Sequence, residues 1–281
     1  MKIMVTGANG QLGHDVIKVL DTREISNLPV DMDDFDITDK EAVFKAVNLY
    51  KPTAVIHCAA YTAVDNAENE PELCYAINEK GTFNIAQSCK AIGAKMMYIS
   101  TDYVFDGKKN GLYLPNDTTN PLSVYGKSKL AGELAVKETL ACYFIVRTSW
   151  VFGKNGNNFV KTMLRLGKEQ KSVNVINDQF GSPTYTADLA ILLYALIITE
   201  KYGVYHATNE GYCSWAEFAQ EIMLLSENDC NVNLITTEQY PTKAIRPRNS
   251  RLSKDSLIKN GFSLLPPWKE ALQQYLSCLK P

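Results

Sequence analysis

The feature that most constrains the fold of this chain is a regular alternation of apolar runs and amphipathic segments over residues 2–153. Such alternation is typical of a parallel sheet with helices on both faces and right-handed crossovers. We therefore expect an α/β protein built on a Rossmann-type doubly wound parallel sheet. Strands are expected at residues 2–8, 28–32, 53–60, 95–105 and 143–153, and helices at 10–22, 39–50, 72–93 and 124–140.

The pattern loosens after Gly153 and predicts a smaller mixed C-terminal lobe. Apolar residues recur with helical spacing in residues 156–170 and 214–228 and in the last part of residues 173–197. Residues 203–209 are typical of a strand. The predicted boundary separates residues 1–152 from residues 153–281. Because no flexible linker divides the two parts, we expect some later segments to return to the first domain.

Composition excludes several classes of function. The 281 residues are 46% hydrophobic and 21% charged, and the net charge of −2 gives no attraction to nucleic acid or an anionic membrane. The longest apolar run, 189–198, is shorter than the roughly 20 residues of a membrane span. The chain opens on a strand pattern, so no signal peptide is expected. Seven widely spaced cysteines without a Cys-x-x-Cys motif favour reduced thiols in the cytoplasm.

A glycine array follows the first predicted strand. Gly7, Gly10 and Gly13 form a G-x-x-G-x-x-G spacing immediately before the first predicted helix. Glycine permits a tight turn and a close approach of the backbone to a ligand, and a helix N-terminus offers free N–H groups to a pyrophosphate. In this strand–turn–helix context, the array predicts a dinucleotide site in the first domain.

The end of the second predicted strand bears on the choice of dinucleotide. Asp31 lies 18 residues after Gly13, where an acid often accepts a hydrogen bond from the adenine ribose 2′-OH. Such an acid favours NADH, because a 2′-phosphate would meet a like charge. The stretch holds five aspartates, so a solvated Asp31 is an equally good interpretation, and Asp36 is a second candidate beside the adenine. The choice between NADH and NADPH stays open.

A tyrosine and a lysine stand four residues apart at the start of a predicted helix. Tyr125 and Lys129 would share one helix face, although Tyr143 and Arg147 show that such spacing also arises by chance. Thr101 ends the preceding predicted strand, and ligands of open α/β sheets lie beyond the carboxyl ends of the strands. We therefore expect Thr101, Tyr125 and Lys129 to converge on the dinucleotide site.

These three residue types suit the reduction of a carbonyl group. A phenol with a pKa of about 10 is a weak acid at neutral pH. A nearby ammonium group favours the phenolate form and so lowers this pKa. We expect Lys129, together with an oxidised nicotinamide, to lower the pKa of Tyr125. Tyr125 would then act as a general acid, while Thr101 donates a hydrogen bond to the same substrate oxygen.

The chain resembles the extended short-chain dehydrogenase/reductase family, and within it the dTDP-4-dehydrorhamnose reductases. The motifs that carry the resemblance run in order along the sequence: "GANGQLG", "AAYTAVDNAE", "STDYVFDG", "PLSVYGKSKLAGE", "RTSWVFG", "GNNFVKTMLRL", "VINDQFGSPT" and "RPRNSRL". The resemblance implies NADH- or NADPH-dependent reduction of the 4-keto group of dTDP-4-dehydro-L-rhamnose. It also implies a dinucleotide-binding domain at 1–152 and a mainly substrate-binding lobe at 153–281.

The resemblance further implies roles for individual residues. Thr101, Tyr125 and Lys129 would be catalytic. The cofactor would contact Gly7, Gly10, Gln11, Leu12, Gly13, Asp31, Asp36, Ala59, Ala60, Tyr61, Tyr125 and Lys129. The dTDP-sugar would contact Val64, Asp65, Asp102, Tyr103, Trp150 and Arg246, with Arg246 and Arg248 suited to a diphosphate.

Some members of this group pair through a metal held by carboxylates. Asp15 and Asp188 match two of those positions, but Lys269 stands near the third. We therefore expect no metal, and a monomer or a homodimer.

Two other functions share many of these motifs. One is a non-catalytic nucleotide-binding subunit that resembles the regulatory subunit of methionine adenosyltransferase, and the other is a sugar-nucleotide epimerase. The intact Thr101, Tyr125 and Lys129 count against the first, because a binding subunit needs no proton donor. An epimerase would use the same residues without net consumption of cofactor.

Overall fold

The computed structural model describes residues 1–279 and is built around a six-stranded parallel sheet. The strand order is β10-β5-β4-β3-β1-β2, which confirms the Rossmann-type sheet predicted from the sequence. The strands of this sheet are β1 (Lys2–Thr6), β2 (Ser26–Val30), β3 (Ala54–His57), β4 (Lys95–Thr101), β5 (Tyr143–Thr148) and β10 (Gly203–His206).

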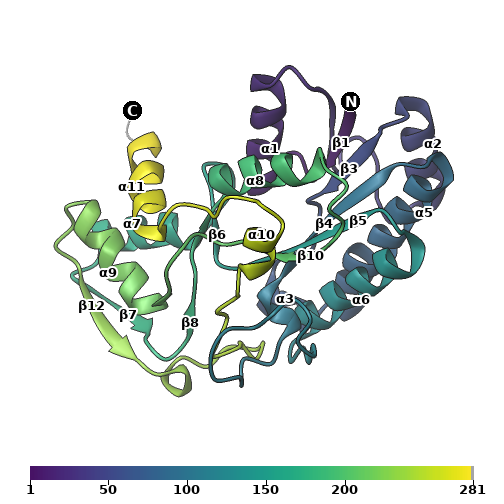
Figure 1. Cartoon of the computed structure of the whole chain (residues 1–281). Helices are drawn as coiled ribbons and strands as arrows, with labels where there is room; N and C mark the ends of the chain where they lie inside the picture. The colour runs from purple at the N-terminus through teal and green to yellow at the C-terminus, as the bar shows by residue number, and fades with distance from the viewer. Residues whose placement is uncertain (280–281) are drawn as a thin grey trace.

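Helices cover both faces of the sheet (Figure 1). On one face, Val16 and Leu193 pack against Ile3 and Val5 of β1. The other face is covered by three helices that share a second buried cluster. The first face carries α1 (Gln11–Thr22) and α8 (Thr186–Ile197), and the second carries α2 (Lys40–Tyr50), α5 (Thr82–Ile92) and α6 (Val124–Thr139).

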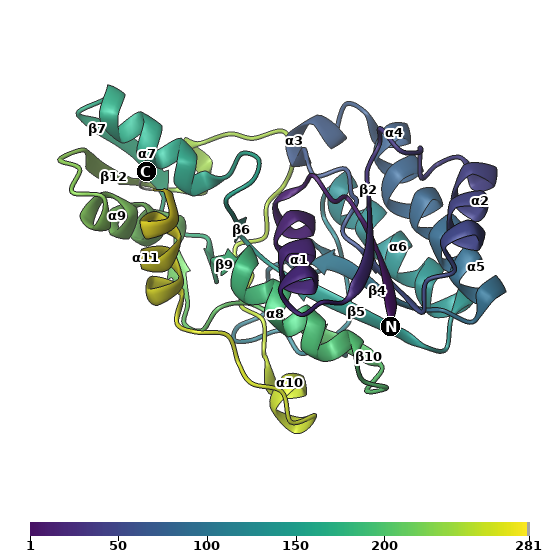
Figure 2. The same ribbon diagram turned by 90° about the horizontal axis from the view of Figure 1, so that it is seen from above.

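The smaller lobe has its own core beyond the carboxyl ends of the strands (Figure 2). Its aromatic centre includes Phe152, Phe218 and Tyr275. The helices of this lobe are α7 (Phe159–Glu169), α9 (Trp215–Leu225) and α11 (Trp268–Leu279). Its short sheets pair β6 (Val151–Phe152) with β9 (Thr184–Tyr185), β7 (Ser172–Ile176) with β12 (Asn231–Ile235), and β8 (Phe180–Gly181) with β11 (Cys213–Ser214).

Part of the second half of the chain packs on the main sheet. Strand β10 forms its edge beside β5, and α8 lies against α1. The short helix α10 (Asp255–Lys259) contacts β10. Residues 186–206 are therefore continuous with the fold of the first half.

The predicted strand at 143–153 is wrong at its end. β5 stops at Thr148, and the chain resumes as β6 at Val151 in a different sheet. Between them Trp150 has φ 51°, a left-handed conformation that no regular strand accommodates. The break turns the Trp150 side chain onto Trp215, with ring centroids 3.7 Å apart.

The predicted helix at 72–93 is interrupted. It consists of α4 (Pro71–Tyr75), a π-helical segment (Ala76–Gly81) and α5, and it ends at Gly93 as expected. A short helix, α3 (Val64–Ala67), precedes it, and 3₁₀ turns cover Asp102–Val104 and Thr237–Gln239.

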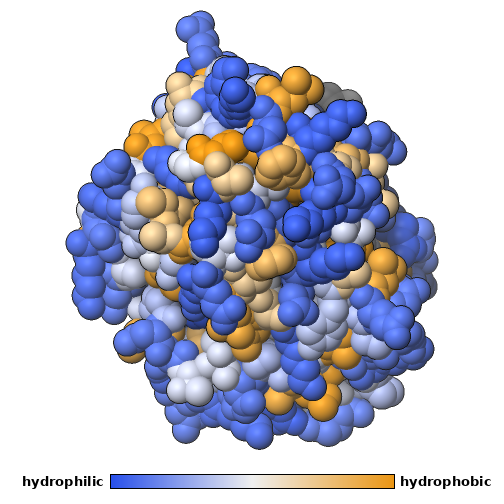
Figure 3. Space-filling view, turned by 90° about the vertical axis from the view of Figure 1, so that its right-hand side faces the viewer, coloured by the Kyte–Doolittle hydropathy of each residue, from blue (hydrophilic) through white to orange (hydrophobic). Residues whose placement is uncertain are grey.

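The outer surface of the helices α2 and α5 is mainly hydrophilic. Figure 3 views the molecule from this side, and hydrophilic residues predominate there, with apolar residues scattered in small groups. In α2, Val43 and Val47 are buried, whereas Phe44 and Leu49 are exposed. Scattered apolar side chains of this kind are ordinary on the surface of a folded protein.

The start of α6 is fixed by its own sequence. Ser123 has an extended backbone, and its Oγ accepts a hydrogen bond from the backbone N–H of Gly126. A serine at this position satisfies one of the free N–H groups of the first turn. Tyr125 therefore lies in the first turn of α6, close to the carboxyl end of β4.

Within residues 1–279, no helix is both long and apolar enough to cross a membrane.

Gly7 provides a test of how tightly the first turn packs. Gly7 and Gly93 have nearly equal φ angles of 69° and 70°, but a Cβ at Gly7 would lie 2.6 Å from the Ala59 nitrogen, whereas a Cβ at Gly93 would meet nothing within 4 Å. Gly93→Ala should lower the free energy of unfolding by about 1 kcal/mol through backbone strain. Gly7→Ala should cost about 2 kcal/mol more through overpacking. Equal losses in urea unfolding would contradict the close approach.

Candidate active site

A cavity of about 760 Å³ lies at the carboxyl ends of the parallel strands, where the two lobes meet. It brings together most of the residues predicted to form the site. Those that line it are Gly7, Gly10, Gln11, Leu12, Gly13, Asp31, Asp36, Ala59, Ala60, Val64, Thr101, Asp102, Tyr103, Tyr125, Trp150 and Arg246. Tyr61, Asp65 and Lys129 are not part of this lining.

Gly7 and Gly13 of the glycine array pack too tightly for any other residue type. A Cβ at Gly13 would lie 2.1 Å from the Gly7 oxygen, so α1 can approach the turn only because Gly13 lacks a side chain. No side chain of residues 1–279 caps the N-terminus of α1. A helix N-terminus facing a cavity, without a side-chain cap, fits the pyrophosphate of a dinucleotide.

The second lobe holds the glycine turn from the other side. Asn155 donates a hydrogen bond to the carbonyl oxygen of Asn9 at 2.8 Å, and Asn158 donates one to the Gln11 side chain at 3.0 Å. These contacts join the turn to the region that precedes α7. They were not predicted, because no local pattern relates residues about 150 positions apart.

Asp31 lies at the end of β2 with both carboxylate oxygens engaged. One accepts a hydrogen bond from the Asn9 backbone N–H and the other from that of Met32, each at 2.8 Å. Each oxygen has a second lone pair, so the carboxylate can still accept a ribose hydroxyl. Asp31 therefore supports the glycine turn, whichever dinucleotide binds.

Tyr125 and Thr101 line the same cavity. Burial raises the pKa of Tyr125 well above its usual range. The protein's own groups therefore shift the pKa of Tyr125 upward, opposite to the lowering expected from Lys129 and an oxidised nicotinamide together. The aromatic ring of Tyr103 stands edge-on to Tyr125, with ring centroids 5.5 Å apart.

Lys129 lies behind the cavity rather than in its wall. Its Nζ donates a hydrogen bond to the Ile99 carbonyl oxygen at 2.7 Å and stands 4.1 Å from the centre of the Tyr98 ring. Burial lowers the pKa of Lys129 to about 7, while the Glu133 carboxylate opposes the loss of its proton. The position of Lys129 is thus set by the backbone of β4.

The other end of the cavity carries a polar cluster. Arg246 donates hydrogen bonds to the Tyr103 hydroxyl at 2.9 Å and to the Asp65 carboxylate at 2.5 Å, and the Ala244 N–H donates to the second Asp65 oxygen. The guanidinium is half-buried and also faces the cavity. Arg248 differs, because it is exposed and paired with Glu238.

Tyr61 and Trp150, also predicted to belong to the site, differ in their relation to the cavity. The Tyr61 hydroxyl donates to the Glu70 carboxylate at 2.6 Å, away from the cavity lining. Trp150 does line the cavity, stacked on Trp215. Trp215 was missed because its place in the site depends on this stacking, which the sequence spacing does not show.

The carboxylates considered as metal ligands have protein partners. Asp15 accepts a hydrogen bond from the Thr186 hydroxyl, and Asp188 accepts one from Asn209 at 2.8 Å. Lys269 pairs with Glu221 at 2.7 Å. No group of three or more potential metal ligands is found among residues 1–279.

Comparison with known proteins gives full-length matches. The sequence model of the family described as "RmlD substrate binding domain" matches residues 1–280. The dTDP-4-dehydrorhamnose reductase of Aggregatibacter actinomycetemcomitans is 43% identical over 286 residues, covering 97% of each chain.

Two solved structures extend the similarity to the fold. A dTDP-4-dehydrorhamnose reductase from Clostridium acetobutylicum is 45% identical with a TM-score of 0.97, covering 99% of each chain. The enzyme of that name from Bacillus anthracis, solved in complex with NADP, is 46% identical with a TM-score of 0.96, covering 98% of each chain.

Asp102 makes the stability of the folded protein depend on pH. Its carboxyl is buried, Oδ2 has no hydrogen-bond partner among residues 1–279, and burial raises its pKa to about 6. The folded protein therefore holds this proton more tightly than the unfolded chain, where the pKa is about 3.9, and stability falls as pH rises through about 6.

The variant Asp102→Asn lacks this titration. Relative to wild type, it should gain about 2 kcal/mol in the free energy of unfolding between pH 4 and pH 7, measured by urea unfolding. Asp33→Asn, at an exposed position, is the control for a general charge effect. A stability difference between wild type and Asp102→Asn that stays constant with pH would contradict the raised pKa.

Proposed function

Because the chain belongs to the dTDP-4-dehydrorhamnose reductase family of the extended short-chain dehydrogenase/reductases, we propose that it reduces the 4-keto group of dTDP-4-dehydro-L-rhamnose to give dTDP-L-rhamnose. The observation that carries the proposal is the single cavity in which the glycine turn, Thr101 and Tyr125 meet. A reducible carbonyl placed there would be within reach of both a dinucleotide and a proton donor.

The cofactor is proposed to be NADH or NADPH. When bound, a reduced nicotinamide supplies the hydride for the carbonyl carbon. The glycine turn would hold its pyrophosphate, and Asp31 and Asp36 line the end of the cavity suited to the adenine ribose. The NADP complex of the Bacillus anthracis enzyme supports use of the phosphorylated cofactor, whereas the acidic stretch at residues 31–36 favours the unphosphorylated one.

Tyr125 is proposed as the proton donor. Its raised pKa keeps the phenol protonated at neutral pH, which is the form needed to give a proton to the C4 oxygen. The Thr101 hydroxyl has one hydrogen, which it donates to Asp102 Oδ1 at 3.0 Å. Thr101 can donate to the substrate oxygen only after this hydroxyl rotates away from Asp102.

The polar cluster is proposed to receive the dTDP-sugar. Arg246 presents a guanidinium, whose fork geometry suits diphosphate oxygens, and Asp65 and Tyr103 hold it in place. Val64, Asp102 and Trp150 line the same cavity and would contact the sugar.

We also propose that the protein works in the cytoplasm as a monomer or a homodimer. The cytoplasmic location is supported by the cysteines, all seven of which are free thiols. Disulfides are rare in that compartment because glutathione keeps thiols reduced.

A substrate panel tests the proposed reaction. The protein is mixed with dTDP-, UDP- and GDP-linked 4-keto sugars and with NADH or NADPH, and the nicotinamide absorbance is followed. We expect stoichiometric oxidation with the dTDP-linked substrate. Binding without turnover would instead indicate a regulatory nucleotide-binding subunit, and conversion without net cofactor oxidation an epimerase.

Replacing the proposed acid gives the first mutational test. Tyr125→Phe should lower kcat by about 10²–10⁴-fold, the usual contribution of a positioned acid, with little change in cofactor affinity. Tyr50→Phe, which removes a hydroxyl remote from the cavity, should leave kcat unchanged. Turnover of Tyr125→Phe within a few-fold of wild type would rule out Tyr125 as the donor.

A further inference from the structure

A fully buried ion pair stands directly behind the catalytic face of α6. Tyr125, Lys129 and Glu133 are spaced by four residues each and lie on the same side of this helix. The Glu133 carboxylate has no solvent exposure, and it forms an ion pair of 2.7 Å with Arg147 of β5. A buried charge is tolerated only when it is paired and hydrogen-bonded.

Both members of the Glu133–Arg147 ion pair have further hydrogen-bond partners. Glu133 Oε1 accepts hydrogen bonds from Ser100 Oγ at 2.6 Å and from Arg147 Nε at 2.7 Å, and Oε2 accepts from Arg147 Nη2 at 2.7 Å. The remaining guanidinium nitrogen donates to the Pro115 carbonyl oxygen at 3.0 Å and stands 3.4 Å from His206 Nε2. The pair therefore ties α6 to β4, β5 and β10.

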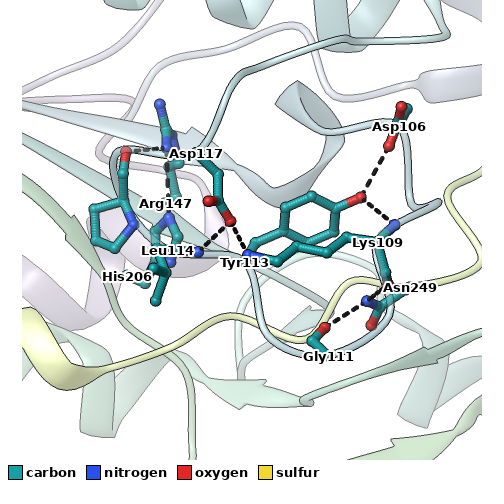
Figure 4. A network of polar contacts seen from close by, with 10 residues as sticks. Asp106, Lys109, Gly111, Tyr113, Leu114, Asp117, Arg147, His206 and Asn249 are labelled. Atoms are coloured by element: carbon teal, nitrogen blue, oxygen red, sulfur yellow. Dashed lines mark hydrogen bonds and ion pairs between the residues drawn. The ribbon is translucent and has the colours of Figure 1, made fainter.

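The contacts of Arg147 continue into the loop that follows β4 (Figure 4). In this loop Asp117 accepts hydrogen bonds from Lys109 Nζ and the Leu114 N–H. Asn249 donates to the Lys109 and Gly111 carbonyl oxygens at 2.7 Å each. The ion pair is thus anchored on several elements, so its position does not depend on α6 alone.

Glu133 and Lys129 bind neighbouring residues of β4. Lys129 bonds to the Ile99 carbonyl, Glu133 bonds to the Ser100 side chain, and Thr101 is the next residue along the strand. Together they fix how far α6 is rotated and shifted relative to β4. Tyr125 therefore depends on both contacts for its place opposite Thr101.

Glu133 also provides the negative charge that acts on Lys129. Among the other titratable groups near this amine, burial lowers the pKa of His57 to about 3 and raises that of Cys58 to about 12. Burial likewise raises the pKa of Cys74, Tyr98 and Tyr125, so these groups are neutral at pH 7. Two cations stand beside the Glu133 carboxylate: Arg147 at 2.7 Å and the Lys137 amine at 3.7 Å.

We propose that Glu133 is a positioning residue that keeps the Lys129 amine protonated and aligned with Tyr125, with Arg147 holding the carboxylate in place. The catalytic meaning of this arrangement rests on the proposed reductase function. The charge effect itself is a property of the free protein and can be measured without turnover.

The direct test is a titration of Lys129 in the full chain labelled with ¹³C-lysine, its Cε signal being assigned with Lys129→Met. Glu133→Gln keeps the shape and deletes the charge, so the midpoint should fall by about one pH unit or more. Arg147→Gln deletes the opposite charge of the pair, so the midpoint should rise. Glu138→Gln, at an exposed position of the same helix, should leave it unchanged.

Opposite shifts distinguish a charge effect from a loss of packing. If both variants shift the Lys129 midpoint in the same direction, or neither shifts it, the proposal is wrong. Should Glu133→Gln fail to fold, the double variant with Arg147→Gln is compared with Arg147→Gln alone, since this pair also differs only in the Glu133 charge. An unchanged midpoint in that comparison would overturn the proposal equally.

A pH profile of kcat/KM connects the charge to the reaction. The alkaline limb of Glu133→Gln should move to lower pH by the same amount as the Lys129 midpoint. A lower rate with an unmoved limb would leave Glu133 with a structural role only. Absence of turnover in wild type would reject the proposed function, while the titration would still decide the role of Glu133.

Discussion

The site depends on how α6 docks against the carboxyl end of β4. Two side chains of α6 bond to consecutive residues of that strand, Lys129 to the Ile99 carbonyl and Glu133 to Ser100. Because both groups are buried, their hydrogen bonds cannot be exchanged for bonds to water without a large penalty. Tyr125 and Thr101 thereby come to the same cavity from elements that are separate in the sequence.

The two lobes are joined by a sharp change of backbone direction after β5 and not by a flexible linker. The left-handed backbone conformation of Trp150 ends β5, and the Trp150 indole stacks on that of Trp215. The side chains of Asn155 and Asn158 then donate hydrogen bonds to the glycine turn. The cavity walls from the two lobes are therefore joined by direct contacts, with each lobe retaining its own core.

The sequence predicted the sheet and the glycine turn because these features rest on local periodicity and on the special backbone freedom of glycine. It also predicted that Thr101 and Tyr125 would meet, since strand ends share one edge of a parallel sheet. It did not predict the direction of the Tyr125 pKa change, which burial controls, or the position of Lys129 behind the cavity wall. The Trp150–Trp215 stacking depends on tertiary packing that no local pattern encodes.

In the proposed reaction the cavity directs a hydride to C4 of a dTDP-linked 4-keto sugar. The most direct measurement supplies NADPH or NADH deuterated at the transferring C4 position of the nicotinamide and locates the label in the product by NMR. We expect deuterium at C4 of the sugar in dTDP-L-rhamnose, in equal amount to the cofactor oxidised. A sugar product without deuterium at C4, or conversion without net cofactor oxidation, would contradict the proposed hydride transfer.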